Sequence, residues 1–174
     1  MRLLRSLAFL AAMCAALALS GCSGSFTPEV RSYAMGDRIV LGRLVYSVFE
    51  TRWLPQIGEG PTARVPQNRF FLIRMSVGTT AAGEILIPNK TIEDDKGNSF
   101  AELSNGEGVP QWLGFLRPVT TSGGTVGNAL FDAPPAHYKL HLSDENSQET
   151  ALVDIPLSFR AETPELPDRN AYPK

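Results

Sequence analysis

Residues 69–77 have the sequence RFFLIRMSV, and this stretch decides the fold class of the chain. One set of its alternate positions is entirely apolar and consists of Phe71, Ile73, Met75 and Val77. The other set becomes polar toward its end, at Arg74 and Ser76. Successive side chains of a β-strand point to opposite faces, so the alternation predicts a strand with one fully buried face. We expect this strand to lie in the centre of a sheet.

Residues 151–159, ALVDIPLSF, show the same alternation and predict the last strand of the chain. Pro156 has no backbone N–H to donate to a neighbouring strand. It therefore predicts that this strand lies at a sheet edge or contains a bulge.

Other short stretches rich in β-branched and aromatic residues are bounded by glycine, proline or turn residues. They are residues 39–41, 44–53, 84–92, 99–103, 113–116, 125–131 and 138–142. Strands of this spacing, about seven to nine in number, predict an all-β sandwich with little helix. We place this single domain at residues 36–160.

The N-terminal 22 residues have the pattern of a bacterial lipoprotein signal. Arg2 and Arg5 precede an apolar segment that ends in the small residues Ser20 and Gly21 and then Cys22. The pattern predicts that residues 1–21 are removed and that Cys22 carries acyl chains, which would hold the protein at a membrane. The alternative is an ordinary secretory signal with a cysteine after the cleavage site by chance.

Residues 22–35, from Cys22 onward, predict a flexible tether, and residues 161–174 predict a disordered or extended tail rich in proline and charge. Ser23 follows the predicted lipidated residue. The usual inner-membrane retention signal of Gram-negative bacteria has an aspartate there. The predicted location is therefore the cell envelope, with the periplasmic face of the outer membrane favoured if the organism is Gram-negative.

The charge of the chain is mildly acidic, with a formal net charge of −2. Nucleic-acid-binding proteins instead carry clustered Lys and Arg, so we expect no nucleic-acid partner. The chain has 2 cysteines, and Cys14 lies within the predicted signal segment. The processed chain would therefore have no disulfide, and its core must hold the domain together.

His137 and His141 are the only histidines. Four-residue spacing would place them side by side on a helix, where they could share a metal ion. The alternation of Tyr138, Leu140 and Leu142 predicts a strand instead, and at ~3.3 Å per residue two such Cα atoms lie about 13 Å apart. We therefore expect two solvent-facing strand histidines and no metal site.

Residues 94–98, DDKGN, admit two interpretations. Asp94 and Asp95 beside a glycine suggest a cation-binding loop, but the EF-hand spacing of acidic residues is missing. A β-turn in which Gly97 or Asn98 has a positive φ explains the same residues. We favour the turn and keep Asp94 and Asp95 as possible interaction residues.

No motif of a catalytic centre occurs in the sequence. There is no Gly-x-Ser-x-Gly nucleophile motif, and the glycine-rich residues 123–127 lack the lysine of a phosphate-binding loop. A Ser, His and Asp triad assembled by the fold is the alternative. We predict a protein that is not an enzyme and has no cofactor.

The tryptophans are the largest side chains available for recognition. Trp53 ends an apolar strand, and we expect it in the core. Trp112 follows the loop sequence Val109-Pro110-Gln111. It is a possible interaction residue, and packing within the loop is the alternative.

The order of these features resembles the telokin-like, immunoglobulin-like extracytoplasmic domain of unknown function found in bacterial lipoproteins. The resemblance covers residues 36–159, and its strongest element is the segment from Phe131-Asp132 to Pro134 before Tyr138-Lys139-Leu140. Residues 118–119 and 78–79 depart from the family's usual Pro-Gly turn and asparagine. The resemblance implies an immunoglobulin-like β-sandwich that acts as a binding or structural module.

The leading functional hypothesis is a lipid-anchored envelope protein whose domain contacts a protein partner. The second hypothesis is a lipoprotein that binds a small ligand or a divalent metal through the loop at Asp94 and Asp95. An envelope hydrolase is the third.

Overall fold

The computed structural model describes residues 30–114, 117–120 and 124–158. Within these ranges the chain forms 11 strands and one short 3-10 helix, η1 at Gly60–Thr62. The strands are β1 (Arg31–Ala34), β2 (Ile39–Leu41), β3 (Leu44–Leu54), β4 (Arg69–Thr79), β5 (Ile85–Leu86), β6 (Thr91–Asp94), β7 (Ser99–Ala101), β8 (Pro118–Val119), β9 (Thr125–Ala133), β10 (Tyr138–Ser143) and β11 (Thr150–Ile155). No helix in this part of the chain is long and apolar enough to cross a membrane.

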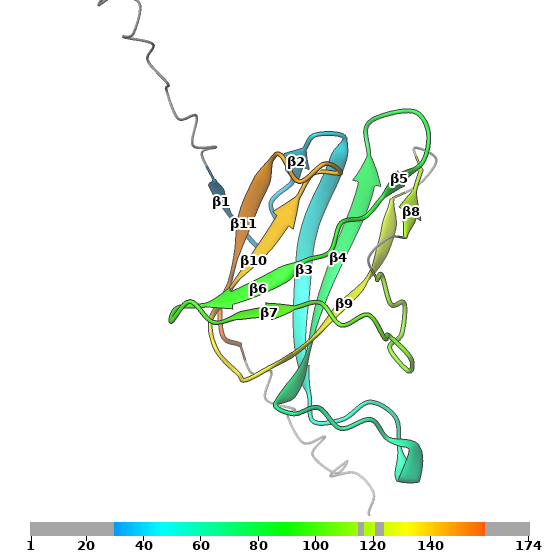
Figure 1. Cartoon of the computed structure of the whole chain (residues 1–174), viewed down its shortest axis with the longest axis vertical. Helices are drawn as coiled ribbons and strands as arrows, with labels where there is room; N and C mark the ends of the chain where they lie inside the picture. The colour runs from blue at the N-terminus through cyan, green and yellow to red at the C-terminus, as the bar shows by residue number, and fades with distance from the viewer. Residues whose placement is uncertain (1–29, 115–116, 121–123, 159–174) are drawn as a thin grey trace, which may run out of the picture.

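Two sheets face each other and form a β-sandwich (Figure 1). One is 5-stranded, in the order β1-β11-β10-β6-β7, and the other is 4-stranded, in the order β2-β3-β4-β9. β5 and β8 pair separately. The predicted all-β sandwich is confirmed. The strands exceed the predicted number because β1 and β8 were not predicted and the stretch predicted as one strand at residues 84–92 forms both β5 and β6.

The stretch that predicts the fold class forms β4, in the centre of its sheet between β3 and β9. Its alternation also holds. Phe71, Ile73, Met75 and Val77 are each at most 1% exposed, whereas Arg74 and Ser76 on the other face are half-buried.

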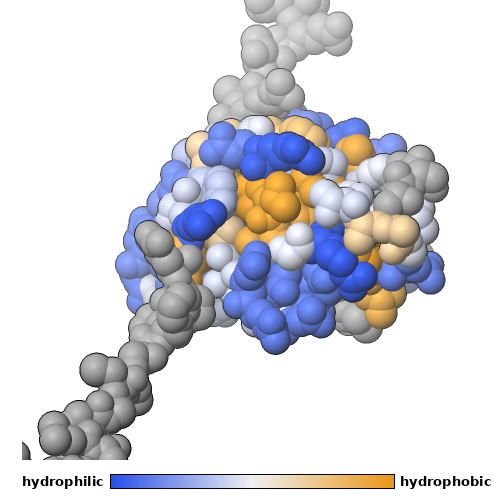
Figure 2. Space-filling model, turned by 90° about the horizontal axis from the view of Figure 1, so that it is seen from above, coloured by the Kyte–Doolittle hydropathy of each residue, from blue (hydrophilic) through white to orange (hydrophobic). Residues whose placement is uncertain are grey.

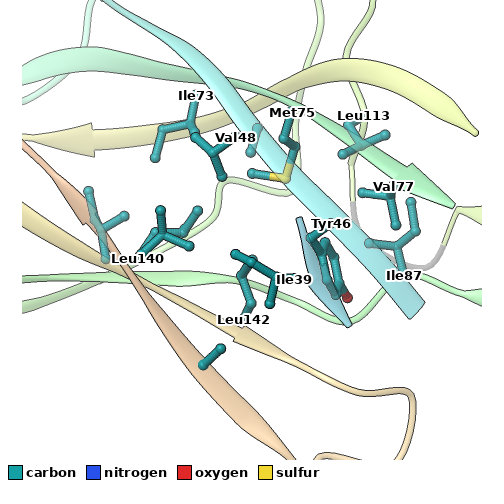
Figure 3. Close-up of a cluster of buried hydrophobic side chains, with 14 of the residues drawn as sticks. Ile39, Tyr46, Val48, Ile73, Met75, Val77, Ile87, Leu113, Leu140 and Leu142 are labelled. Atoms are coloured by element: carbon teal, nitrogen blue, oxygen red, sulfur yellow. The ribbon is translucent and has the colours of Figure 1, made fainter. Parts of the chain in front are cut away.

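The core fills the space between the two sheets (Figure 3). Tyr46 and Val48 of β3 meet Leu140 and Leu142 of β10 across this space. The hydroxyl of Tyr46 donates a hydrogen bond to the carbonyl oxygen of Ser143 at 2.9 Å. Each fully buried large apolar side chain stabilises the fold by about 1.5–3 kcal/mol, so the sandwich needs no disulfide.

Two turns, one from each sheet, are bonded to each other at one end of the sandwich. The backbone N–H of Gly42, between β2 and β3, donates to Oε2 of Glu149 at 3.0 Å. Nε of Arg43 lies 2.5 Å from Oε1 of Glu145, between β10 and β11. We call these four residues the turn clasp. Seen from above in Figure 2, hydrophilic residues at this end surround an apolar area.

The prediction of a flexible tether at residues 22–35 is wrong for its last part. Arg31–Ala34 form β1, which pairs in parallel with β11. Sheet pairing uses main-chain groups and requires no apolar pattern, so no feature of residues 31–34 predicts this strand. Because β1 covers β11, the last strand is not a sheet edge as predicted, and it ends at Ile155 before Pro156. Residues 22–29, with Cys22, lie outside the described residues.

The single strand predicted at residues 84–92 is two strands in different sheets. β5 pairs with β8, and β6 pairs with β7 and β10. Pro88 lies between them and cannot donate a ladder hydrogen bond, so the chain leaves one sheet and enters the other. The strand predicted at residues 113–116 is absent at Leu113 and Gly114, and residues 115–116 lie outside the described residues.

Candidate functional site on the outer face of the β3–β4–β9 sheet

The carboxylate of Asp94 holds the turn between β6 and β7. Its Oδ1 accepts hydrogen bonds from the backbone N–H groups of Lys96 (2.9 Å) and Asn98 (2.8 Å), and its Oδ2 accepts one from Nδ2 of Asn98 (2.8 Å). These hydrogen bonds lower the pKa of Asp94, and the bond from the Asn98 side chain has the largest effect. Gly97 has φ 83°, which confirms the predicted turn.

Asp95 takes part in a contact that the sequence did not reveal. The imidazole of His137 lies between two carboxylates, with Nδ1 2.9 Å from Oδ1 of Asp95 and Nε2 2.8 Å from Oδ1 of Asp154. The hydrogen bond to Asp95, supported by Asp154, raises the pKa of His137. A histidine with both nitrogens donating is an imidazolium cation, which has no lone pair for a metal ion or a substrate proton. We call these three residues the histidine clamp.

His141 lies apart from the histidine clamp on β10, and its Nε2 is 3.5 Å from Oε2 of Glu93. Tyr138, Leu140 and Leu142 are buried, so the predicted strand alternation around His141 is confirmed. His137 itself precedes the strand. In the part of the chain that the structure describes, no group of three or more His, Cys, Asp or Glu side chains could hold a metal ion.

Trp112 is half-buried within its loop. Its indole ring lies directly against Gly106 and close to Gly114, and it joins a second apolar cluster of Ile57, Phe70, Leu72, Val109 and Leu130 on the outside of the sheet. Its Nε1 is buried without a hydrogen-bond partner among the described residues. This placement matches the packing alternative for Trp112. Trp53 also follows its prediction, because it stacks on Phe71 at 4.0 Å between ring centroids.

The loop that contains Trp112 is held to the edge of β9. The N–H of Leu113 donates to the carbonyl oxygen of Asn128, and the N–H of Asn128 donates to that of Gln111, both at 2.9 Å. Nδ2 of Asn128 donates to the carbonyl oxygen of Pro110 at 2.7 Å. Gln111 has φ 48°, a left-handed conformation that few non-glycine residues adopt. Such strain is often found at functional sites.

A hollow of about 210 Å³ opens between this loop and the sheet. Its polar lining includes Arg74, Asn128 and Glu50. In the strand register, Arg74 of β4 lies opposite Asn128 of β9 on one side and opposite Glu50 of β3 on the other. The other residues that line it are Thr51, Arg52, Leu54, Leu72, Pro110 and Gln111. We call this site the Arg74 hollow.

A β-bulge shapes one wall of the Arg74 hollow. The register between β3 and β4 shifts between Val48 and Glu50. The extra residue of a bulge bends its strand, and bulges are common beside functional sites. Phe49 occupies the extra position and is 51% exposed. The sequence gives no sign of this shift, although Arg74 in the centre of an apolar strand was a signal for a polar site on its outer face.

The fold is similar to that of several solved structures. The yjhA protein from Bacillus subtilis is 14% identical, with 71% of this chain and 98% of that chain covered and a TM-score of 0.55. The secreted protein MPT63 from Mycobacterium tuberculosis is 12% identical, with 72% and 98% covered and a TM-score of 0.55. A candidate lipoprotein, ycdA from Bacillus subtilis, is 10% identical, with 71% and 39% covered and a TM-score of 0.50.

These likenesses show the fold alone. No family model matches the sequence. No curated protein sequence matches it either. The comparisons therefore support the β-sandwich that the immunoglobulin-like resemblance implies. Proteins that share this fold include a secreted protein and a candidate lipoprotein.

Proposed function

We propose that this protein is a lipid-anchored component of the bacterial cell envelope whose β-sandwich binds a protein partner without catalysing a reaction. The observation that carries the binding role is the Arg74 hollow, which combines guanidinium and amide donors with apolar walls on an accessible sheet face. Such a mixture is typical of recognition sites. The sequence LSGC at residues 19–22 supports the lipid anchor at Cys22.

Two further observations support a role other than catalysis. Both ring nitrogens of His137 face carboxylates, so this histidine is poorly suited to act as a general base. The polar groups of the Arg74 hollow are arginines, amides, the carboxylate of Glu50 and the hydroxyl of Thr51. The Thr51 hydroxyl lies 3.5 Å from the hydroxyl of Ser158, which is not a base that could activate it as a nucleophile. The similarity in fold to a secreted protein and a candidate lipoprotein favours an envelope location.

The second hypothesis, a small ligand or divalent metal bound at Asp94 and Asp95, has less support. Asp94 uses both oxygens within its own turn, and Asp95 holds His137. A thermal-shift panel with divalent ions and glycans tests it. Binding at 100 times the dissociation constant would stabilise the fold by ~2.7 kcal/mol.

The test of the proposed function is capture of a partner. The protein is expressed in its host with its N-terminal segment intact and a C-terminal affinity tag, and it is then purified from detergent-solubilised envelope. We expect one envelope protein to be retained in stoichiometric amount. We also expect Cys22→Ser to move the protein from the membrane fraction to the soluble fraction. Retention of no envelope protein by folded protein would overturn the binding role.

A further inference from the structure

The Arg74 guanidinium is an unsatisfied donor group. Arg74 is half-buried, and no hydrogen bond or ion pair engages its guanidinium within the described residues. A guanidinium has five N–H donors in a planar fork that matches a carboxylate. Leaving such donors partly desolvated and unbonded is unfavourable, so a ligand that supplies acceptor oxygens gains affinity here.

Arg52 adds a second positive charge to the same hollow. Its side chain is 66% exposed, and its Nη2 lies 3.9 Å from Oε1 of Glu50, which is a loose contact. Arg52 and Arg74 outweigh Glu50 in the hollow, so its formal charge is positive although the chain as a whole has a net charge of −2. The hollow complements an acidic ligand at short range, within the screening length of about 10 Å at 0.1 M salt.

The size of the hollow indicates what kind of ligand it accepts. A volume of about 210 Å³ is smaller than the ~300–1,000 Å³ of pockets that enclose a free small molecule. It suits one side chain that projects from a larger partner. Leu54, Leu72 and Pro110 line it beside the arginines, so the methylene groups of a glutamate would have apolar contacts.

The surface around the hollow extends the contact area. Phe49 is 51% exposed at the bulge next to Glu50, and Val126 is 43% exposed on β9. Val126 lies opposite Ser76, one outward-facing position from Arg74 and Asn128. Exposed apolar side chains around an arginine are typical of protein interaction surfaces.

The hollow lies beside the part of β3 that follows its pairing with β2, which ends at Tyr46. Residues 50–52 and Leu54 of β3 line the hollow. The C-terminal part of the chain reaches this edge of β3, since Oγ1 of Thr51 lies 3.5 Å from Oγ of Ser158. A partner therefore reaches the hollow from the outer face of the sheet.

We propose that the Arg74 hollow binds a glutamate or aspartate side chain of an acidic segment of a protein partner, with Phe49 and Val126 as flanking apolar contacts. The proposal rests on the proposed binding function and adds the chemistry of the partner. The carboxylate accepts hydrogen bonds from Arg74 and Arg52, and the segment lies over the outer face of β3, β4 and β9.

Two capped five-residue peptides test the proposal on the purified protein. One has a central glutamate between valines, and the other has glutamine at that position. We expect the glutamate peptide to bind at least about tenfold more tightly than the glutamine peptide. We also expect its affinity to fall as the salt concentration rises. Nuclear magnetic resonance shifts of the amides of Glu50, Gln111 and Asn128 report the site of binding.

Arg74→Gln is expected to abolish the preference for glutamate, whereas the matched control Arg31→Gln, on β1 of the other sheet, keeps it. Equal affinity for both peptides, or an equal loss in the two variants, would overturn the proposal. A change between monomer and dimer in Arg74→Gln would also overturn it, because the occupant would then be a second copy.

Capture from the envelope distinguishes a wrong binding site from the absence of a binding function. If Arg74→Gln retains the same envelope protein as the unsubstituted chain, the hollow is wrong and the binding function stands. If neither protein retains a partner, the binding function itself fails.

Discussion

Nζ of Lys90 lies 2.9 Å from Oε2 of Glu102 inside the molecule, and both side chains are at most 2% exposed. The residues are also joined through the backbone, since the N–H of Glu102 donates to the carbonyl oxygen of Lys90 at 2.9 Å. Oε1 of Glu102 is buried without a hydrogen-bond partner among the described residues. Burial is the largest influence on both groups; it lowers the pKa of Lys90 and raises the pKa of Glu102.

This buried ion pair predicts opposite effects for single and double substitutions. Lys90→Met or Glu102→Leu alone leaves one uncompensated buried charge and should cost about 3–5 kcal/mol in the free energy of unfolding. The double variant removes both charges and should be neutral or more stable than the unsubstituted chain by about 1–4 kcal/mol. Urea unfolding at neutral pH measures all four proteins. A double variant as unstable as the sum of the singles would contradict the prediction.

The fold was predictable where local pattern and burial agree. The alternation at residues 69–77 correctly predicts a central strand because β4 is buried on one face along most of its length. The turn at Asp94–Gly97 follows in the same way from its own residue types. Both features are determined by residues close together in the chain.

The candidate site was not predictable because it depends on register and on contacts between distant segments. The Arg74 hollow requires the shift between Val48 and Glu50 and the attachment of Gln111 to Asn128. The histidine clamp brings Asp95 and Asp154 to His137 from two other strands or turns. No spacing in the sequence encodes these distances, and β1 likewise forms through main-chain pairing alone.

The histidine clamp predicts a pH dependence of stability. Its carboxylates raise the pKa of His137 above 6.5, so its contribution is complete below the ordinary pKa of histidine and is lost as pH rises through the folded pKa. We expect the urea midpoint of the unsubstituted chain to contain a component that is complete at acidic pH and falls as the pH rises above the ordinary pKa of histidine, about 6.5. His137→Gln should remove that component. His141→Gln keeps the clamp and should show the same pH dependence as the unsubstituted chain. If His141→Gln removes the component and His137→Gln keeps it, the component belongs to His141 and the prediction is wrong.

The contact between Gly106 and Trp112 predicts a steric effect. A Cβ at Gly106 would overlap the indole ring, so Gly106→Ala must displace the ring or the loop. We expect a loss of about 1–3 kcal/mol and a red shift of tryptophan fluorescence, measured in a Trp53→Phe background so that Trp112 alone emits. Gly78→Ala is the control, because its new Cβ would lie 3.7 Å from Cα of Gly124, an ordinary contact distance. Equal effects of the two substitutions would show that Trp112 does not rest on Gly106.

The turn clasp predicts that two glycines with positive φ respond differently to alanine. Gly42 has φ 52° and Gly36 has φ 93°, so each alanine variant should lose about 1–2 kcal/mol through the left-handed backbone alone. At Gly42 the new Cβ would also lie 2.9 Å from Oε2 of Glu145, whereas at Gly36 no atom lies within 4 Å. Gly42→Ala should therefore be the less stable variant by about 1 kcal/mol in urea unfolding. Adding Glu145→Ala removes the clashing oxygen, so its effect in the Gly42→Ala background should be less destabilising than in the unsubstituted chain. Additive effects would show that the carboxylate moves aside, and that the clasp does not fix the two turns against each other.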